Sequence, residues 1–348
     1  MNTMYSAGNA GPKVKSDCKV TLQLAKSGGI QLNINSKVEK YFRQHLNKLI
    51  TNALIHFGIN NCQLTLEDSG ALDYVILARL ESVAEQALGK VPAYLPEKSE
   101  RNITIGKDNF RRSRLYLPGN TPKFFINAGL YESDGIIFDL EDSVAPEKKD
   151  EARFLVRNAL IAGSYGQSEL MVRINQLPLG LKDLAAVIPF GVDTILVPKC
   201  QTATEIRQIE EKIEELKTSH KINKSIFLMP IIESALGVMN AYEIAKASDS
   251  NVALTIGLED YTADLGVERT LDGKESEFAR NMLVNAAKAA GVQAIDSVFS
   301  NVDNLAQLKA TARVSKSMGL DGMGSIHPRH NAEIHKVFAP TETEIEKA

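Results

Sequence analysis

Two carboxylates stand where apolar stretches of the sequence end and helical patterns begin. Glu233 follows the apolar stretch 226–232, and Asp260 follows a second one, 252–256, about one strand–helix–strand unit later. If both stretches are neighbouring parallel strands, their carboxyl ends lie side by side, and so do the two side chains. A buried charge is costly unless something pairs with it. Because two carboxylates leave coordination positions open for water and substrate, we predict that Glu233 and Asp260 hold Mg²⁺.

Glu233 taken alone has a second interpretation. A glutamate that opens a helix also interacts favourably with the helix dipole, so this residue by itself does not decide between a structural and a metal-binding role. The matching position of Asp260 at the end of another predicted strand favours the metal.

Polar side chains also follow most of the other predicted strands. Carboxylates, an arginine, a lysine and one histidine occupy these positions, whereas the first strand ends in a Pro-Gly-Asn turn. Such oxygen-rich sites suit Mg²⁺, because zinc sites more often contain histidine or cysteine. The residues concerned are Asp139, Glu141, Asp142, Arg173, Asn175, Lys199 and His327, with the turn residues Pro118, Gly119 and Asn120.

The arginines near the strands have roles that the sequence leaves open. We expect Arg173 both to neutralise Asp139 or Glu141 and to face substrate. Three further arginines begin the first strand, where they either bind phosphates or form a charged strand start. These are Arg111, Arg112 and Arg114.

Asp296 and the histidines near the end of the chain have simpler interpretations. Asp296 precedes the end of its predicted strand, which favours a structural role. His327, His330 and His335 are irregularly spaced around Pro328, so we expect surface or loop histidines rather than a metal cluster.

The elements that must position these residues repeat as a strand followed by a helix. Eight strands in this rhythm predict an α/β fold in which residues 111–348 form a (β/α)₈ barrel, with its active site at the carboxyl ends of the strands. No strand is followed by Gly-x-Gly-x-x-Gly, so a dinucleotide site has no support. The predicted strands are 113–117, 135–140, 170–174, 194–197, 226–232, 252–256, 294–299 and 322–326.

A small α+β domain is predicted ahead of the barrel. Residues 1–17 lack periodicity and predict a flexible arm, residues 18–89 form the domain, and residues 90–110, with two prolines and a charged run, predict a linker. Within the domain we expect a hairpin, a helix opened by a capping box, and two further strands. The elements are strands 19–25 and 30–34, the box residues Ser36 and Glu39, and strands 62–66 and 74–80.

The composition excludes several classes of protein. The chain has 348 residues, 44% hydrophobic and 24% charged, which is typical of a globular protein of about two domains. A net charge of −3 implies no general affinity for nucleic acid. Residues 1–15 are polar, so we expect no secretory signal there. The apolar runs are too short for a bilayer, and the cysteine spacing indicates neither disulfides nor zinc. We predict a cytoplasmic protein with no membrane partner.

Several ordered motifs run from residue 111 to the end of the chain. They are Ser113-Arg114-Leu115-Tyr116-Leu117-Pro118-Gly119-Asn120, Phe138-Asp139-Leu140-Glu141-Asp142-Ser143-Val144, Val172-Arg173-Ile174-Asn175, Ile232-Glu233-Ser234-Ala235-Leu236-Gly237 and Ile326-His327-Pro328. Together they resemble the citrate lyase beta subunit and its relatives, the malyl-CoA and citramalyl-CoA lyases of the HpcH/HpaI aldolase group.

The resemblance implies the roles of individual residues. It implies Mg²⁺ held by Glu233 and Asp260, and a catalytic arginine, Arg173, in contact with substrate. It implies a CoA-type thioester near the first and last strands, with Arg114 facing the phosphates. It also implies a homo-oligomer such as a trimer, or a citrate lyase-like complex. The substrate-binding residues implied are Arg114, Pro118, Gly119, Asp139, Glu141, Asn175, Lys199, His327 and Pro328.

The activity implied is carbon–carbon bond cleavage of a 3-hydroxyacyl thioester. The hydroxyl becomes a ketone and a thioester enolate is left, so Mg²⁺ would stabilise the alkoxide and Arg173 the enolate oxygen. The products are a 2-oxo acid and an acetyl thioester. The substrate is a citramalyl, malyl or citryl group carried on CoA or on an acyl carrier protein.

The front domain resembles the acyl carrier (gamma) subunit of citrate lyase. The family's carrier segment reads Ser-Ser-Asp, and its first serine bears the prosthetic group, whereas this chain has Lys15-Ser16-Asp17. The position of the attachment serine is thus occupied by Lys15. Either Ser16 takes its place as the attachment residue, or the domain only aids assembly, which we favour. The likeness is carried by Gly29-Ile30-Gln31-Leu32, Ser36-Lys37-Val38-Glu39 and Gly70-Ala71-Leu72-Asp73.

Relatives continue beyond the point that matches Ala348 into a segment that supplies an aspartate as acid or base. We expect another group to move the proton here, or a chain that continues. Two other functions stay open. One is a non-catalytic assembly or carrier subunit of a citrate lyase-type complex. The other is an aldolase acting on free 2-oxo acids, which a requirement for CoA would exclude.

Overall fold

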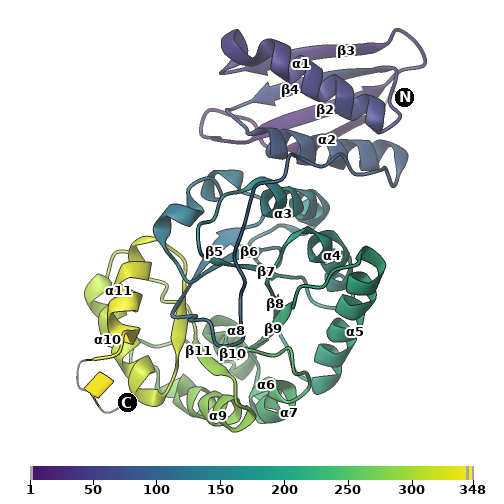
Figure 1. Ribbon diagram of the computed structural model, residues 1–348. Helices are drawn as coiled ribbons and strands as arrows, with labels where there is room; N and C mark the ends of the chain where they lie inside the picture. The colour runs from purple at the N-terminus through teal and green to yellow at the C-terminus, as the bar shows by residue number, and fades with distance from the viewer. Residues whose placement is uncertain (1–2, 342–344, 347–348) are drawn as a thin grey trace. The chain divides into compact units, whose positions relative to one another are not determined.

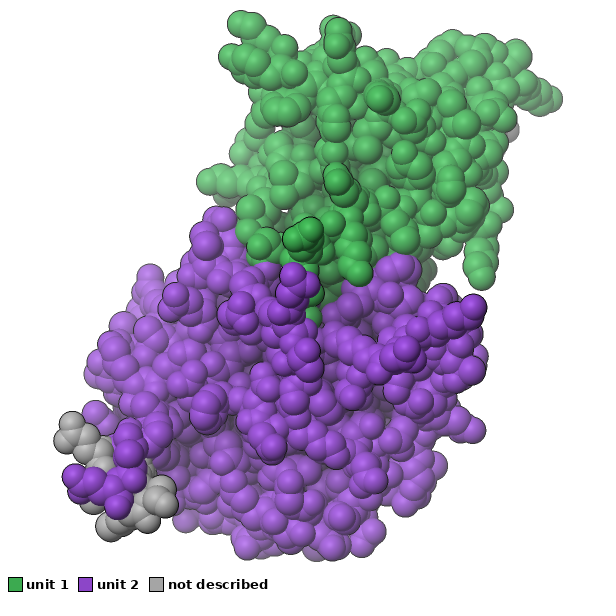
Figure 2. Space-filling view, in the orientation of Figure 1, with its two compact units in different colours: residues 1–101, 118–126, 142–164 green, residues 102–117, 127–141, 165–348 purple. Residues whose placement is uncertain are grey.

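The computed structural model describes residues 3–341 and 345–346. No helix in these residues is both long and apolar enough to span a membrane. All three cysteines are buried and unbridged. The chain divides into two compact units, shown in different colours in Figure 2: residues 1–101, 118–126 and 142–164 form the first, and residues 102–117, 127–141 and 165–348 form the second.

The second unit contains a closed eight-stranded barrel surrounded by helices (Figure 1). Its strands follow one another around the ring in chain order, and all eight predicted strands are present, which confirms the (β/α)₈ fold. The strands are β5 (Ser113–Pro118), β6 (Gly135–Asp139), β7 (Glu169–Arg173), β8 (Thr194–Val197), β9 (Phe227–Ile232), β10 (Ala253–Ile256), β11 (Gln293–Asp296) and β12 (Gly322–Ser325).

Apolar side chains fill the interior of this barrel. Ile137, Met171, Leu196 and Met229 come from four successive strands and pack together, with Tyr116 of β5 half-buried against them. The barrel is therefore a packed core, and only its carboxyl end is available for chemistry.

The helices of this unit alternate with the strands. α5 shows how the sequence sets one of them: Thr202 and Glu205 form a capping box at its start, and apolar residues buried at helical spacing face the barrel. The helical pattern after Glu233 forms two short helices, α6 and α7, which meet at Asn240. The elements are η2 (Ala128–Tyr131), α4 (Gly180–Val187), η4 (Ile188–Phe190), α5 (Ala203–His220), α6 (Ala235–Met239), α7 (Ala241–Ala245), α8 (Leu258–Leu265), α9 (Lys274–Ala290), α10 (Leu305–Met318) and α11 (Arg329–Phe338).

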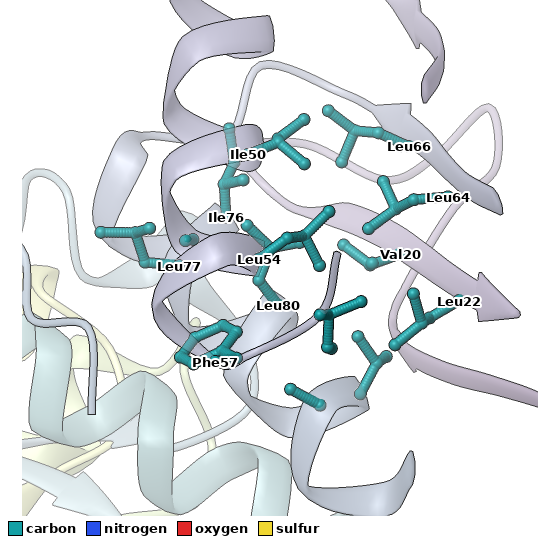
Figure 3. Close-up of a cluster of buried hydrophobic side chains, with 14 of the residues drawn as sticks. Val20, Leu22, Ile50, Leu54, Phe57, Leu64, Leu66, Ile76, Leu77 and Leu80 are labelled. Carbon is teal, nitrogen blue, oxygen red and sulfur yellow. The ribbon is translucent and has the colours of Figure 1, made fainter. Parts of the chain in front are cut away.

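The first unit is built on a four-stranded sheet with the order β1-β2-β4-β3. Leucines, isoleucines and a valine of this sheet and of helices α1 and α2 point toward one another and form its core, as Figure 3 shows. Helix α3 belongs to the same unit and packs on α2. The elements are β1 (Met4–Gly8), β2 (Cys18–Leu24), β3 (Ile30–Ser36), α1 (Glu39–His56), β4 (Cys62–Asp68), α2 (Asp73–Leu88), η1 (Pro122–Phe124), η3 (Pro146–Lys148) and α3 (Lys149–Ala162).

Two predictions about the strands of this sheet are wrong. Within the predicted flexible arm, residues 4–8 form β1, which pairs antiparallel with β2. The stretches 19–25 and 30–34 are strands but not a hairpin, because β4 lies between them, antiparallel to β2 and parallel to β3. Short-range patterns reveal a strand but not its partner when the pairing depends on a distant segment.

Two predictions about its helices are also wrong. Residues 74–80 lie in helix α2 and not in a strand, because that helix is buried on nearly all sides and therefore shows no amphipathic period. Ser36 does not cap α1. It ends β3, where its hydroxyl donates to Asp68 at 2.5 Å and accepts from the nitrogen of Val38 at 3.1 Å.

The predicted linker, residues 90–110, ends earlier than expected. Residues from 102 onward belong to the second unit, where Ile105 packs with Phe227 and Val252 in a small buried cluster. The connecting segment is therefore confined to the residues between α2 and position 101.

Candidate active site

Charged side chains from five successive strands meet at the carboxyl end of the barrel. Arg173 is the last residue of β7, and Glu233 immediately follows β9. Glu141 and Lys199 each lie two residues beyond a strand, and Asp260 lies in the first turn of α8. The structure thus brings together the residues that the sequence placed at strand ends.

Glu233 is held in a fixed position although it is only 5% exposed. Its Oε1 accepts a hydrogen bond from the backbone nitrogen of Lys199 at 2.6 Å. Burial raises the pKa of Glu233 to about 8, and the charges of Asp260 and Glu141 act in the same direction, against this hydrogen bond and Arg173. A buried carboxylate beside two others requires a proton or a cation.

Gly257 makes room for this carboxylate. It lies directly after β10, and a Cβ built on it would stand 2.9 Å from the Cβ of Glu233 and closer still to Oε2. No larger residue fits there unless Glu233 moves. This role of Gly257 leaves no signal in the sequence, because a glycine contributes space and not a polar group.

Lys199 connects the carboxylates around it. Its Nζ donates to Oε1 of Glu141 at 2.8 Å and lies 3.9 Å from Oδ2 of Asp260. The backbone of Lys199 is in the left-handed region, with φ at +48°, which is uncommon for a residue other than glycine. This conformation presents the backbone nitrogen to Glu233 while the side chain serves the other two carboxylates.

Arg173 is clamped by two carboxylates. Its Nε and Nη2 each donate to Asp139 at 2.7 Å, and its Nη1 lies 3.1 Å from Oε2 of Glu141. Burial alone would lower the pKa of Arg173, but the hydrogen bonds and charge of Asp139 raise it above its usual value. The guanidinium also stacks over the ring of Tyr116, 5.5 Å from its centroid. Arg173 is therefore charged and oriented, as a substrate-binding group must be.

The residues present fit a bound divalent cation. Glu233 supplies a buried carboxylate whose pKa is raised by burial. Asp260, which follows the neighbouring strand, supplies a second carboxylate whose side chain is 40% exposed. In the described part of the chain no group of three or more His, Cys, Asp or Glu residues is arranged as a metal site. A site built from two carboxylates, completed by water and substrate, is consistent with both observations.

Arg114 lies elsewhere than expected. Its side chain is buried inside the barrel, where it donates to the sulfur of Met229 at 2.8 Å and to the hydroxyl of Thr255 at 2.9 Å. Burial lowers the pKa of Arg114 to about 10. A phosphate could not reach this guanidinium without a change in the barrel interior, so the structure does not support the expected phosphate contact.

Other predicted substrate residues differ in their surroundings. Asn175 is buried and donates to Asp183 of α4 at 2.7 Å. His327 lies in the half-buried loop after β12, and Pro328 caps α11. Pro118 ends β5 and, with Gly119, belongs to the first unit, so their roles stay predictions.

The remaining histidines and Asp296 have structural partners. His330 lies in α11 and is fully buried, so the expectation of a surface or loop histidine is wrong for this residue. His335 lies in the same helix with its side chain 22% exposed, and its Nε2 contacts the hydroxyl of Ser113. Helical spacing buries one face of α11, and His330 falls on it. Asp296 is buried and bound to Arg280 and Ser315, as its predicted structural role requires.

Two further residues at the site were missed. Tyr116 was predicted only as a residue of the strand 113–117, whereas its ring lies under the guanidinium of Arg173. Gln176, three residues beyond β7, donates to Oε1 of Glu141 at 3.3 Å. Alternation predicts the inward face of a strand but not which inward residue reaches its open end.

The fold and the charged strand ends define a (β/α)₈ barrel enzyme whose active site is rich in carboxylates. A model of the HpcH/HpaI aldolase/citrate lyase family matches residues 112–328, more than half of the chain, and the chain belongs to that family. A second model, described as malonate decarboxylase delta subunit, matches residues 6–87, so the front domain is of the acyl carrier type.

Curated relatives agree with this assignment. The citrate lyase subunit beta of Leuconostoc mesenteroides subsp. cremoris is 40% identical over 247 residues, which cover 70% of this chain and 82% of the relative. The L-malyl-CoA/beta-methylmalyl-CoA lyase of Cereibacter sphaeroides is 29% identical over 259 residues, with 68% and 81% covered. The chain is a lyase of this family.

Solved structures are similar in the barrel. The citrate lyase beta subunit from Mycobacterium tuberculosis, complexed with oxaloacetate and magnesium, has a TM-score of 0.57 at 27% identity and covers 67% of this chain and 99% of its own. Protein CitE of the same organism, in complex with magnesium, acetoacetate and coenzyme A, has a TM-score of 0.57 at 26% identity, with 68% and 84% covered.

Proposed function

We propose that the chain is a Mg²⁺-dependent lyase that cleaves the carbon–carbon bond of a 3-hydroxyacyl thioester into a 2-oxo acid and an acetyl thioester. The observation that carries the proposal is the buried carboxylate of Glu233, with a pKa raised to about 8, beside Asp260 and close to Arg173. The magnesium and coenzyme A bound by the Mycobacterium tuberculosis relative support it.

Glu233 and Asp260 would hold the metal. When bound, Mg²⁺ supplies positive charge that stabilises an oxygen on which negative charge develops. Glu233 is suited to this role because its Oε1 is already fixed by the nitrogen of Lys199, which leaves Oε2 as the oxygen beside Gly257.

Arg173 would bind the oxygen of the thioester. During cleavage the hydroxyl proton leaves, the electron pair of the broken bond moves onto the thioester, and the enolate then takes up a proton at carbon. A guanidinium held by Asp139 and Glu141 and stacked on Tyr116 needs no reorientation to donate to that enolate oxygen.

The test uses the full chain with citramalyl-CoA, malyl-CoA and citryl-CoA supplied separately. We expect release of a 2-oxo acid from at least one of them in the presence of Mg²⁺, loss of release with EDTA, and loss in Glu233→Gln. Release that persists in EDTA, or unchanged turnover in Glu233→Gln, would refute the metal assignment. Release from a free 3-hydroxy acid without CoA would favour an aldolase instead.

A further inference from the structure

Helix α3 is shared between the lyase part of the sequence and the compact unit of the carrier-like domain. It lies inside the stretch that matches the lyase family, residues 112–328, yet it is part of the compact unit that contains the carrier-like domain. The first unit in Figure 2 therefore combines a whole carrier-type domain with a helix of the lyase stretch. The contacts inside this unit show how firmly the two are joined.

The carrier segment itself takes part in the junction. Asp17, directly after the candidate attachment residue Ser16, is 3% exposed and accepts two hydrogen bonds from Arg79, each of 3.1 Å. Arg79 of α2 is completely buried and lies 3.4 Å from Oε1 of Glu151 on α3. One guanidinium thus joins the carrier segment to α3.

Arg79 has a further partner beyond the domain. Its Nη1 donates to Oδ1 of Asn120 at 2.7 Å, and Nδ2 of Asn120 in turn donates to Oε1 of Glu151 at 2.9 Å. The arginine, its two carboxylates and this amide form one connected network. Lys148, whose Nζ lies 3.3 Å from Oε1 of Glu151, supplies the second positive charge.

Strand β1 makes a second connection to the same glutamate. The backbone nitrogen of Gly8 donates to Oε2 of Glu151 at 3.0 Å. Gly8 has a φ of +83°, and any Cβ there would overlap the carbonyl oxygen of Cys18, so glycine is required. Oε2 of Glu151 is thus bound by Gly8 of the carrier-like domain, and Oε1 is contacted by Arg79 and Asn120.

A separate ion pair lies farther along α2 and α3. Arg157 of α3 donates to both oxygens of Glu81 of α2, at 2.7 and 2.6 Å, and both side chains are buried. Nδ2 of Asn158 donates to the carbonyl oxygen of Tyr74 at 3.0 Å. The junction therefore consists of two buried charge networks and not of a single contact.

Separating α2 from α3 would break the hydrogen bonds of both networks and would uncover α2, which is buried on nearly all sides. Exposing its buried apolar side chains to water is costly. A working acyl carrier must release its docking face so that the tethered group can travel. Here the residue directly after Ser16 is buried and bound to Arg79. The peptide nitrogen of Ser16 is also bound, to the carbonyl oxygen of Ser69 at 3.0 Å.

We propose that the carrier-like domain is a fixed module braced on helix α3, and that the lyase takes its thioester from free CoA instead of from a group tethered to Ser16. The use of free CoA rests on the proposed lyase function. The fixed attachment of the carrier-like domain to α3, which we call the brace, does not. The domain has then kept the carrier fold but serves to hold α3 and residues 118–126.

The brace is tested by cutting the chain after it has folded. A specific protease site inserted after Glu97, in the exposed connecting segment, allows the full chain to be cut into residues 1–97 and 98–348. We expect the two pieces to elute together in size-exclusion chromatography at about micromolar concentration. Separate elution of the pieces from the cut wild-type chain would overturn the brace.

A matched pair of variants links the result to the network. Glu151→Gln removes the carboxylate that links α3 to Arg79 and to the backbone nitrogen of Gly8, so we expect its cut pieces to separate at a concentration at least about tenfold higher than the wild type. Glu147→Gln changes an exposed glutamate one helical turn away and should leave elution unchanged. Equal behaviour of the two variants would show that the Arg79 network does not hold the domain.

The substrate carrier is tested on the uncut chain. Ser16→Ala should keep kcat/KM for the cleaved acyl-CoA within about twofold, and the intact mass of the purified wild type should show no group on Ser16. A prosthetic group on Ser16 together with a loss of at least about tenfold in Ser16→Ala would overturn this half. If the wild type cleaves no thioester at all, the proposed lyase function fails, while the elution experiment still decides the brace.

Discussion

Gly257 lies directly against Glu233. Because Gly257 has no side chain, the carboxylate of Glu233 has room beside it. The two residues follow neighbouring parallel strands, β10 and β9, and the nitrogen of Gly257 donates to the carbonyl oxygen of Ile232 at 3.0 Å. The buried carboxylate of Glu233 thus occupies the space that a Cβ at position 257 would need.

The first prediction concerns Gly257→Ala. The backbone of Gly257 has φ −106° and ψ 94°, which alanine can adopt, so the added methyl group acts through its contact with Glu233 alone. We expect the affinity for Mg²⁺ to fall at least about tenfold, since a ligand displaced by one ångström loses its geometry. Isothermal titration calorimetry with Mg²⁺ measures this directly.

Gly106→Ala is the control for this substitution. A Cβ at Gly106 would meet the side chain of Asn109 at 3.5 Å, an ordinary van der Waals distance, and Gly106 lies in the segment before the barrel. Mg²⁺ affinity should be unchanged in Gly106→Ala. If Gly257→Ala binds Mg²⁺ as tightly as the wild type, Oε2 of Glu233 is not a metal ligand.

The second prediction is a pH dependence of metal binding. With a pKa of about 8, Glu233 carries a proton in the metal-free protein at neutral pH, and Mg²⁺ must displace it. The affinity for Mg²⁺ should therefore rise about tenfold per pH unit up to about pH 8 and level off above. Titrations at several pH values would show this slope, and a flat profile would contradict it.

Stability should depend on pH in the opposite sense. The pKa of Glu233 is raised in the folded state, so its contribution to stability is complete below the ordinary pKa of a glutamate and is lost as the pH rises through about 8. In EDTA the melting temperature of the wild type should fall as the pH rises from the ordinary pKa of a glutamate to about 8. Glu233→Gln should remove that part of the fall, because glutamine does not titrate.

The third prediction compares two arginines with the same surroundings. Arg173 binds Asp139 through Nε and Nη2 and stacks on Tyr116, while Arg112 binds Asp134 through Nε and Nη2 and stacks on Phe110. Lysine cannot reproduce either fork. Arg173→Lys should lose about 100-fold or more in kcat, and Arg112→Lys should remain near the wild type. Equal losses would mean that Arg173 acts only on the fold.

A fourth prediction concerns Arg114 and the phosphates that the family resemblance implies for it. Among the described residues, the hydrogen bonds of Arg114 go to neutral acceptors. Methionine has a similar length and no charge, so Arg114→Met should leave the free energy of unfolding unchanged or raise it by about 1–4 kcal/mol. The KM for the acyl-CoA should stay within about twofold. A tenfold rise in KM would restore the phosphate role.

Arg111 provides the contrast. It is equally buried but paired with Glu169, with Nε 2.9 Å from Oε2. Arg111→Met leaves that carboxylate unpaired and should cost about 3–5 kcal/mol. Chemical denaturation of both variants measures the difference, and equal destabilisation would show that the charge of Arg114 is needed where it lies.

These contrasts show what the sequence could predict. The strand–helix rhythm predicted all eight barrel strands. The barrel gathers the strand ends at one place, so polar residues near those ends could be predicted to lie together. They include Arg173, Lys199, Glu233 and Asp260. The phosphate contact implied for Arg114 stays a prediction, because residue type does not say which way a strand residue points. Arg114 and Tyr116 are two apart and share the inward face.

The front domain was harder to predict for a different reason. Its sheet order joins β3 to β4 across helix α1, and its helix α2 is buried by the sheet on one side and α3 on the other. Neither relationship is local, so alternation and helical periodicity could not reveal it. Gly257 was missed because it contributes space and not a group.

The last prediction concerns Lys199, whose Nζ lies between Glu141 and Asp260. Without metal this charge relieves repulsion among the carboxylates, but with metal it competes for them. Lys199→Met keeps the backbone bond to Glu233, so we expect a lower melting temperature in EDTA and an affinity for Mg²⁺ raised by about tenfold. Lys288→Met, which removes an exposed ion pair with Asp321, should change neither quantity appreciably. A weaker affinity in Lys199→Met would instead show that the lysine supports the metal site.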